Sequence, residues 1–247
     1  MNVKSATRAL SILRQLGERA QTHVELSLAL GIPKSSLTGL LGTMIDDGFV
    51  TYDPAERVYG LGPEVLVLAQ RYLAGINVVT TGQASVREIT RETGESTALV
   101  VRAGDDILVV AKENSETPIR RSMQLGERAP MSISAAGRVF LAFMSEAERK
   151  RIINASLMET GLTPERIDAL EEHLRDVRAG GVAYSRAELL SGVIAMGLPV
   201  FDAAGAVAAC LSVSVPSSRF DDILEERIAA SLRRHASALS ATLGARP

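Results

Sequence analysis

The 247-residue sequence has no tryptophan, one cysteine and three histidines. A single cysteine, Cys210, excludes an intrachain disulfide framework and is typical of proteins from a reducing compartment. Cys210 lies in the run AVAACLSVSV, a buried-strand pattern, so a core thiol is favoured over a nucleophile. The histidines (His23, His173 and His235) are widely spaced. No metal-ligand cluster is therefore visible, and no cofactor is predicted.

Long apolar runs and excess positive charge are also absent. No stretch of about eighteen apolar residues indicates a membrane span, and residues 1–16 lack the pattern of a signal peptide, so we predict a cytoplasmic protein. The net charge is −2, and residues 1–62 contain six basic and six acidic side chains. A DNA-binding module of this charge would depend on dimerisation and on backbone N–H and hydroxyl contacts to phosphate.

Residues 22–48 are typical of a helix-turn-helix. Thr22 and Glu25 have the spacing of a capping box, and Gly31 can end the first helix in a left-handed conformation. Pro33 is predicted to open the second helix. The apolar stripe of that helix leaves polar side chains at its beginning pointing outward, where a recognition helix enters the major groove. The stripe consists of Leu37, Leu40, Leu41, Met44 and Ile45.

Residues 48–62 alternate β-prone runs around a turn at Asp53-Pro54, which predicts a hairpin, or wing, directly after the second helix. Arg57 near its tip could meet a phosphate. A helix-turn-helix pattern alone also occurs in helix pairs that only pack, and the wing favours the DNA-binding interpretation. The predicted DNA-binding residues are Thr22, Lys34, Ser35, Ser36, Thr38, Gly39 and Arg57.

The remaining chain predicts an α+β fold. A first helix over residues 5–16 buries Leu10 among others, and a linker helix occupies residues 63–75. From residue 76 onward, helix and strand signals alternate around an antiparallel sheet. The strands are expected at residues 96–102, 106–112, 119–125, 182–185, 193–201 and 206–215. The helices are expected at residues 78–94, 134–143, 145–155, 163–178 and 221–243, the last with Ile223, Leu224, Ile228, Leu232 and Leu239 on one face.

Several motifs together resemble the IclR family of bacterial transcription regulators over nearly the whole chain. The segment GVAYSRAELLSGVIAMGLPVFD (residues 181–202) is the most specific, because nine of its positions fall at the spacing of the family signature. Shorter matches are Arg8–Leu13, Gly31–Ser36, Tyr59–Gly62, Gly94–Ser96 and Ala135–Arg138.

The resemblance implies three parts: a winged helix-turn-helix (residues 1–62), the linker helix and a GAF-like effector-binding domain (residues 76–247). It also implies a dimer, or a dimer of dimers, on double-stranded DNA with a palindromic operator. The residues similar to ligand-holding positions of the family are Ala135 (through its backbone), Ser185, Ala195, Ser212 and Ser214.

The resemblance implies a small organic acid as effector, and a buried carboxylate needs several N–H and O–H donors. Ser212 and Ser214 alternate on one strand and should face the same side, either toward a pocket or toward solvent. Met123, Leu125, Met131 and Met196 are expected to form adaptable apolar walls. An Arg120–Arg121 pair is expected at the surface.

The sequence departs from the family at four positions. Some members have an acid where this chain has Ser185 and a cysteine where it has Ala195, so this pocket is expected to be more neutral and more open. Gly39 replaces a long polar residue, and Gly42 is also unusual. Glycine within a helix costs ~1 kcal/mol relative to alanine. The two glycines either permit close approach of the backbone to DNA or shorten the list of base contacts.

Two other functions compete with a ligand-gated regulator. A hydrolase needs a base beside a serine or cysteine, and neither His173 nor His235 lies in such a motif. No phosphate-binding glycine loop follows a strand, so we predict that the protein is not an enzyme. An interaction module that has lost specific DNA binding differs from the regulator only in its behaviour toward DNA.

Overall fold

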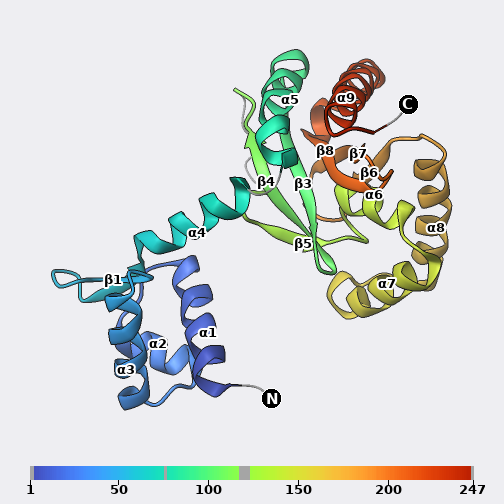
Figure 1. The fold of residues 1–247 in the computed structure, drawn as a ribbon. Coiled ribbons are helices and arrows are strands. Elements are labelled where there is room, and N and C mark those ends of the chain that lie inside the picture. Colours follow the sequence, from blue (N-terminus) through green and yellow to red (C-terminus); the bar gives the residue numbers. More distant parts are fainter. Residues whose placement is uncertain (1–2, 75–76, 117–122, 246–247) are drawn as a thin grey trace. The chain divides into compact units, whose positions relative to one another are not determined.

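The computed structural model describes residues 3–74, 77–116 and 123–245. The chain divides into two compact units, Met1–Gly75 and Ile76–Pro247 (Figure 1). The elements of the first unit are α1 (Lys4–Glu18), α2 (His23–Leu30), α3 (Lys34–Asp46), β1 (Val50–Asp53), β2 (Val58–Leu61) and α4 (Pro63–Ala74).

The first unit is a winged helix-turn-helix around a small apolar core. Ile12 of α1, Leu26 of α2 and Leu37 of α3 are completely buried against one another. Strands β1 and β2 form the predicted antiparallel hairpin, with Val50 opposite Leu61 and Asp53 opposite Val58. Gln21 adds an isolated bridge to Tyr59, which ties the hairpin to the start of α2.

The second unit is built on one six-stranded antiparallel sheet with the order β5-β4-β3-β8-β7-β6. Its strands are β3 (Ser96–Ala103), β4 (Asp106–Glu113), β5 (Arg128–Pro130), β6 (Ala183–Arg186), β7 (Val193–Phe201) and β8 (Val207–Pro216). Its helices are α5 (Asn77–Thr93), α6 (Ala135–Phe143), α7 (Glu146–Thr160), α8 (Pro164–Arg178), the short 3-10 turn η1 (Ser217–Arg219) and α9 (Asp222–Thr242).

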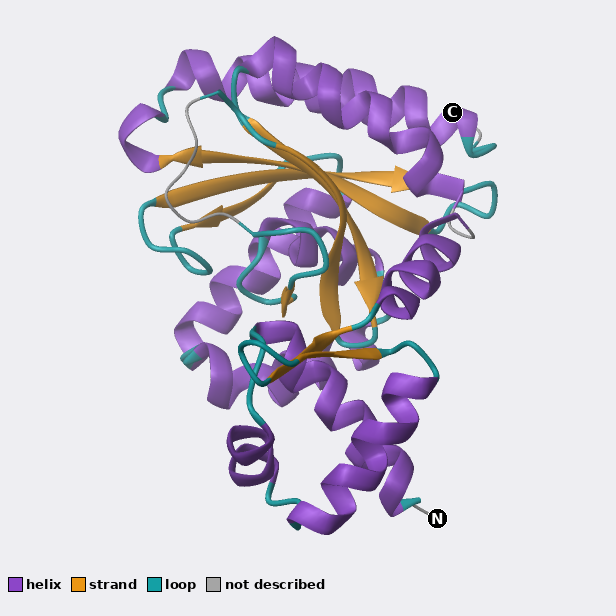
Figure 2. Ribbon diagram, turned by 90° about the vertical axis from the view of Figure 1, so that its left-hand side faces the viewer, coloured by secondary structure: helices purple, strands orange, loops and turns teal. Residues whose placement is uncertain are grey.

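Helices cover both faces of this sheet. Helices α5 and α9 lie side by side along one face (Figure 2). Helix α6 packs on the other face against β7 and β8, and α8 packs on α6. Successive strand residues point to opposite faces, so Leu99 is completely buried on the α5 side while its neighbours Ala98 and Val100 face the α6 side.

Several predicted boundaries need correction. Of the predicted strand 119–125, residues 119–122 lie outside the described residues and residues 123–125 are not in a strand. The edge strand is β5, a three-residue strand too short to give a sequence pattern. Helix α7 continues to Thr160, where Gly161 ends it in a left-handed conformation. Pro33 stands at the N-cap of α3 rather than inside the helix.

Three residues assigned to buried stripes are exposed. Leu10 is 55% exposed, Ile45 37% and Ile223 79%. Each is out of phase with the buried residues of its helix, since one residue turns the helix by about 100°. Ile223 directly precedes buried Leu224, and Ile45 directly follows buried Met44. Apolar character alone therefore overestimated the width of the buried stripe.

Among the described residues, no single helix is long and apolar enough to cross a membrane. Helices α2 and α3 reach the required length and hydropathy as a pair, but the chain bends by 113° between them.

Candidate DNA-binding surface and ligand cavity

Local hydrogen bonds fix both ends of α2, the helix that precedes the turn into α3. The Thr22 N–H donates to Glu25 Oε2 at 2.7 Å, and the Glu25 N–H donates to the Thr22 hydroxyl at 3.3 Å, which completes the predicted capping box. The Thr22 N–H and hydroxyl, with Arg19, lower the pKa of Glu25 to about 2. Gly31 ends α2 with φ 61°, and its N–H donates to the Ser27 carbonyl. The chain bends by 113° between α2 and α3, which is within the range of helix-turn-helix motifs.

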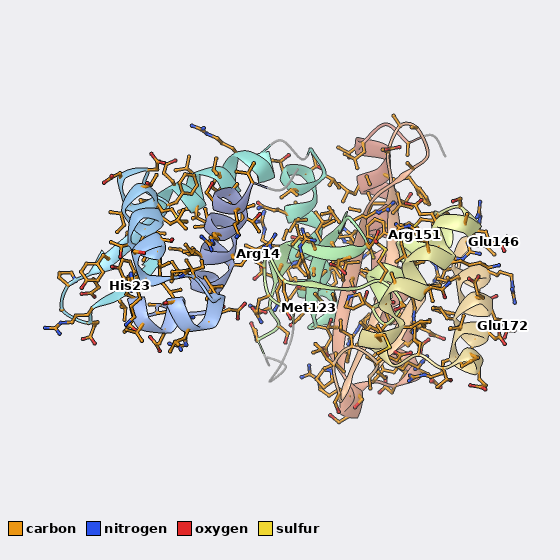
Figure 3. All side chains as sticks on the ribbon, turned by 90° about the horizontal axis from the view of Figure 1, so that it is seen from below. Arg14, His23, Met123, Glu146, Arg151 and Glu172 are labelled. Atoms are coloured by element: carbon orange, nitrogen blue, oxygen red, sulfur yellow. The ribbon has the colours of Figure 1, made fainter. Side chains whose placement is uncertain are left out.

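The first turns of α3 present a polar surface. Lys34, Ser35, Ser36, Thr38 and Gly39 are all exposed. The Thr38 hydroxyl donates to the Lys34 carbonyl at 2.9 Å and lies 3.0 Å from Nε2 of His23. His23, on α2, was not among the predicted residues and bridges the two helices at this surface (Figure 3).

Arg57 and Thr22, the two other residues predicted to contact DNA, differ in their exposure and in the hydrogen bonds they already make. Arg57 lies at the wing tip with φ 57° and is exposed. The turn before it is closed by Asp53, whose Oδ1 accepts the N–H groups of Ala55 and Glu56. Thr22 is half-buried, and the capping box occupies its hydroxyl. A contact from Thr22 to DNA would therefore compete with the cap.

The fold of α3 does not require its two glycines. A Cβ atom built on Gly39 or Gly42 would meet no atom within 4 Å, and neither residue has a positive φ. Both are exposed. An alanine at either position would therefore fit the free protein.

In the second unit, a cavity lies between the sheet and α6. It opens to solvent, and its empty volume including the solvent at the opening is about 620 Å³. All six predicted effector residues line it: Met123, Ala135, Ser185, Ala195, Ser212 and Ser214. The prediction that Ser212 and Ser214 share one face is confirmed, and that face is the cavity rather than solvent.

Strand register arranges the cavity floor in two rows. In the first row Ser96 pairs with Ser214, Ser214 with Ala195 and Ala195 with Ser185, across four neighbouring strands. In the second row Lys112 pairs with Ala98 and Ala98 with Ser212. Hydroxyl groups therefore cross the floor from β3 to β6, while an ammonium group stands on β4.

The opposite wall of the cavity is the beginning of α6. Ser134 caps the helix by accepting the Gly137 N–H at 3.1 Å, and Ala135 and Ala136 line the cavity. The first N–H groups of a helix have no partner within the helix and favour anions. A Cβ on Gly197 would lie 2.9 Å from Cys210 Sγ, so glycine avoids crowding with that side chain, whereas its distance of 3.5 Å from the carbonyl carbon of Ala135 is an ordinary contact.

The cavity hydroxyls already make hydrogen bonds that orient them. Ser185 donates to the Ile133 carbonyl at 2.6 Å, and Ser212 donates to the Met196 carbonyl at 3.0 Å. Both oxygens can therefore accept a hydrogen bond in this arrangement. Ser96 differs, since its oxygen accepts the Ser115 N–H at 3.0 Å and its own proton can be donated.

Lys112 is a lining residue that sequence reasoning missed. If side chains alternated strictly along β4, Lys112 would lie on the face opposite Ile107 and Val109. A bulge at Val110 shifts the register, so that Leu99 pairs with Ala111 but Val100 pairs with Val109. Lys112 therefore lines the cavity together with Ile107 and Val109. Burial lowers the pKa of Lys112, and the carboxylate of Glu127 opposes that shift.

The predicted apolar walls are correct only for Met123. Met131 and Met196 are completely buried but do not line the cavity, and Leu125 is 61% exposed. Met196 follows Ala195 on β7 and must point to the other face of the sheet. Leu189 and Leu190 supply apolar wall instead, from the loop between β6 and β7. Arg120 and Arg121 lie outside the described residues.

The covering loop (residues 187–192) is fixed by a buried ion pair. Arg138 of α6 is 8% exposed and donates from Nη2 to Glu188 at 2.8 Å. It also donates to the carbonyls of Ser132 and Tyr184. Burial raises the pKa of Glu188, but the Arg138 charge and the hydrogen bonds from Arg138 and from the Arg186 N–H outweigh it, so the net shift is downward.

The residues considered for catalysis are engaged elsewhere. Cys210 is completely buried, and that burial raises its thiol pKa. Nε2 of His173 accepts the Tyr184 N–H at 3.0 Å, and burial lowers its pKa, with Arg138 adding to the shift. His235 lies 3.4 Å from Glu92 on the other side of the sheet. Within the described residues, no group of His, Cys, Asp and Glu side chains is arranged to hold a metal ion.

Comparison with known proteins agrees with this geometry. Residues 5–54 match the IclR helix-turn-helix domain, and residues 70–241 match the bacterial transcriptional regulator IclR C-terminal domain. The chain belongs to the IclR family. The regulator KdgR of Escherichia coli (strain K12) is 30% identical over 246 residues, which cover 98% of this chain and 94% of KdgR.

Solved structures of the family share the fold. An IclR transcriptional regulator from Alicyclobacillus acidocaldarius superposes with a TM-score of 0.81 at 28% identity, covering 98% of this chain and 99% of that one. An IclR homolog from Microbacterium hydrocarbonoxydans, complexed with 4-hydroxybenzoate, gives a TM-score of 0.84 at 18% identity, covering 97% and 99%. This IclR-family protein is therefore a DNA-binding transcription regulator and not an enzyme.

Proposed function

We propose that this protein is a cytoplasmic repressor that binds a palindromic operator as a dimer or a dimer of dimers, under the control of a small organic acid. The observation that carries the proposal is the cavity: five residues chosen by family position and Met123, chosen as an apolar wall, come from five separate segments and line one space. Two of the relatives, YiaJ of Escherichia coli (strain K12) and BlcR of Agobacterium tumefaciens, are repressors, which supports repression. The bound 4-hydroxybenzoate in the Microbacterium homolog supports an organic acid as effector.

Control requires that the acid bind two arrangements of the protein unequally. In the proposed mechanism, occupation of the cavity changes the balance between arrangements in which the two recognition helices of a dimer match, or fail to match, the half-site spacing. Helix α4, which joins the two units along the chain, is the proposed lever. Its Leu66 and Leu68 are 63% and 49% exposed, which is consistent with a helix that packs against another chain.

The proposed DNA contacts divide into positioning and reading groups. Lys34 and Arg57 are exposed cations at the start of α3 and at the wing tip, suited to phosphates. Ser35, Ser36 and Thr38 are exposed hydroxyls on α3, suited to base edges or phosphates. Gly39 would let the backbone approach the DNA closely, which the open space around it in the free protein permits.

Lys34→Ala should weaken binding to all DNA sequences alike. Lys34 would neutralise one phosphate, so the slope of log K against log salt should become shallower by about one. Fluorescence anisotropy at a series of salt concentrations measures that slope, with Lys150→Ala on α7 as the matched control. An unchanged slope would remove Lys34 from the DNA interface.

Ser212→Ala combined with Ser214→Ala should leave operator binding intact and abolish the response to the acid. The two hydroxyls stand side by side on the cavity floor, and neither lies in the DNA-binding unit. Gel shifts with and without a panel of organic acids test the expectation. Simultaneous loss of operator binding and of the response would indicate a folding defect, because Ser212 also bonds to the Met196 carbonyl.

The direct test of the whole proposal is a titration against DNA from upstream of the protein's own gene at two salt concentrations, with and without organic acids. Tight, competitor-resistant binding that one acid shifts is the expected result. The zero net charge of residues 1–62 favours one alternative, an interaction module without specific DNA binding. Binding that depends on salt but not on sequence would support that alternative.

A further inference from the structure

Lys112 is the one charged side chain among the described residues that line the cavity. The other polar lining groups are the hydroxyls of Ser96, Ser134, Ser185, Ser212 and Ser214. The remaining wall is aliphatic, and a carboxylate placed in such surroundings needs an opposite charge or several donors. A helix N-terminus provides the equivalent of roughly half a positive charge, whereas an ammonium group provides a full one.

The position of Lys112 in the sheet allows its ammonium group to reach the centre of the floor. Lys112, Ala98 and Ser212 are direct neighbours on β4, β3 and β8. Strands lie about 4.8 Å apart, so the Cα atoms of Lys112 and Ser212 are about 10 Å apart. Ala98 between them is small, and the four-carbon stem of lysine can lie across it.

Donors and acceptors are separated along the floor. Next to Lys112 on the β3 side, Ser96 has a proton to donate, because its oxygen already accepts the Ser115 N–H. Toward β6, Ser185 and Ser212 donate to backbone carbonyls and present lone pairs to the cavity. A ligand that matches this order carries its carboxylate toward β4 and a hydroxyl group toward β6.

We propose that Lys112 and Ser96 form the carboxylate subsite of the effector cavity, and that the effector is a hydroxy acid whose hydroxyl group donates to Ser185 or Ser212. This inference rests on the proposed function and extends it, because Lys112 makes negative charge the property by which the protein selects its effector. Neither the sequence pattern nor the family positions include Lys112, whose orientation follows from the bulge at Val110.

The test measures binding of two matched ligand sets to the full-length protein by calorimetry. The first set is 4-hydroxybenzoate, benzoate and 4-hydroxybenzamide, and the second is 6-hydroxyhexanoate, hexanoate and 6-hydroxyhexanamide. The wild type should bind the hydroxy acid of at least one set about tenfold more tightly than its amide, which corresponds to ~1.4 kcal/mol. The acid without a hydroxyl group should bind more weakly than the hydroxy acid.

Lys112→Met should abolish the preference for acid over amide by weakening the acid alone, and Lys112→Arg should keep the preference. Lys150→Met on α7, an exposed lysine paired with Glu146, is the matched control and should behave as wild type. A preference that survives in Lys112→Met overturns the assignment of Lys112. Equal affinity of acid and amide for the wild type also overturns it but leaves a ligand-gated regulator, whereas no binding from either set contradicts the organic-acid effector itself.

Discussion

Arg138→Met should lower the free energy of unfolding of the second unit by about 3–5 kcal/mol, the usual cost of breaking a buried ion pair. Arg138 is 8% exposed and donates to Glu188 and to the carbonyls of Ser132 and Tyr184. Methionine fills much of the same volume but donates nothing. The variant leaves the Glu188 carboxylate, whose side chain is 17% exposed, without the partner that holds it.

The same variant should weaken effector binding more than it weakens DNA binding in the absence of effector. Glu188 belongs to the covering loop, whose Leu189 and Leu190 line the cavity. Arg138 is thus the link between α6, which forms one wall, and the loop that forms another. Urea unfolding followed by circular dichroism measures the stability, and calorimetry with a bound acid measures the affinity.

The pH dependence of the free energy of unfolding shows whether the unpaired Glu188 charge causes the loss of stability in Arg138→Met. The pKa of Glu188 is lowered in the folded wild type, so the pair stabilises the fold above the unfolded value near 4.5 and loses that contribution as the pH falls through the lowered pKa. In Arg138→Met, burial dominates and raises the Glu188 pKa. Protonation then favours the folded variant, and its deficit relative to wild type should shrink as the pH approaches 4.

Two further variants separate the charge effect from a packing effect. Adding Glu188→Gln to Arg138→Met removes the unpaired charge and should recover part of the lost stability. Arg151→Met is the matched control, because Arg151 pairs with Asp105 on the surface and the two side chains are 56% and 46% exposed (Figure 3). That variant should cost less than about 1 kcal/mol. Equal losses in Arg138→Met and Arg151→Met would show that burial of the Arg138 pair is unimportant.

Gly137→Ala should destabilise the second unit by about 3 kcal/mol, at the upper end of the usual cost of overpacking. A Cβ on Gly137 would lie 2.2 Å from the Cα atom and 2.3 Å from the carbonyl oxygen of Met131. Both are backbone atoms of a completely buried residue, so α6 or the preceding segment must move. Because Ala135 and Ala136 of α6 line the cavity, effector binding should be lost together with stability.

Gly39→Ala is the matched substitution with the opposite expected sign. It should stabilise the first unit by about 1 kcal/mol, because alanine favours helix and its Cβ meets nothing within 4 Å. Operator affinity should nevertheless fall, since the added methyl group would occupy the space proposed for the DNA. Thermal unfolding and gel shifts of both variants test the pair. Operator binding that is unaffected by Gly39→Ala would favour the simpler explanation, a shorter list of base contacts.

Comparison of the two units shows which structural features could be predicted from the sequence. The capping box of Thr22 and Glu25, the left-handed Gly31 and the hairpin after α3 depend on hydrogen bonds between residues a few positions apart. The residues that form each of these features therefore lie close together in the sequence, where the pattern can be recognised. Five of the six effector residues were predicted by family position and Met123 as an apolar wall. Register then explains why Ser185, Ala195 and Ser214 meet: they are direct neighbours in adjacent strands.

The winged helix-turn-helix, the alternation of helices and strands and the family could be recognised from the residues alone, because local hydrogen bonds and motif spacings involve residues close together in the chain. Three features became visible only in the folded protein: the bulge that turns Lys112 into the cavity, the bond from Arg138 of α6 to a loop fifty positions away, and the close packing at Gly137 and Gly197. These features depend on contacts between distant segments. Such contacts leave no periodic signal in either segment.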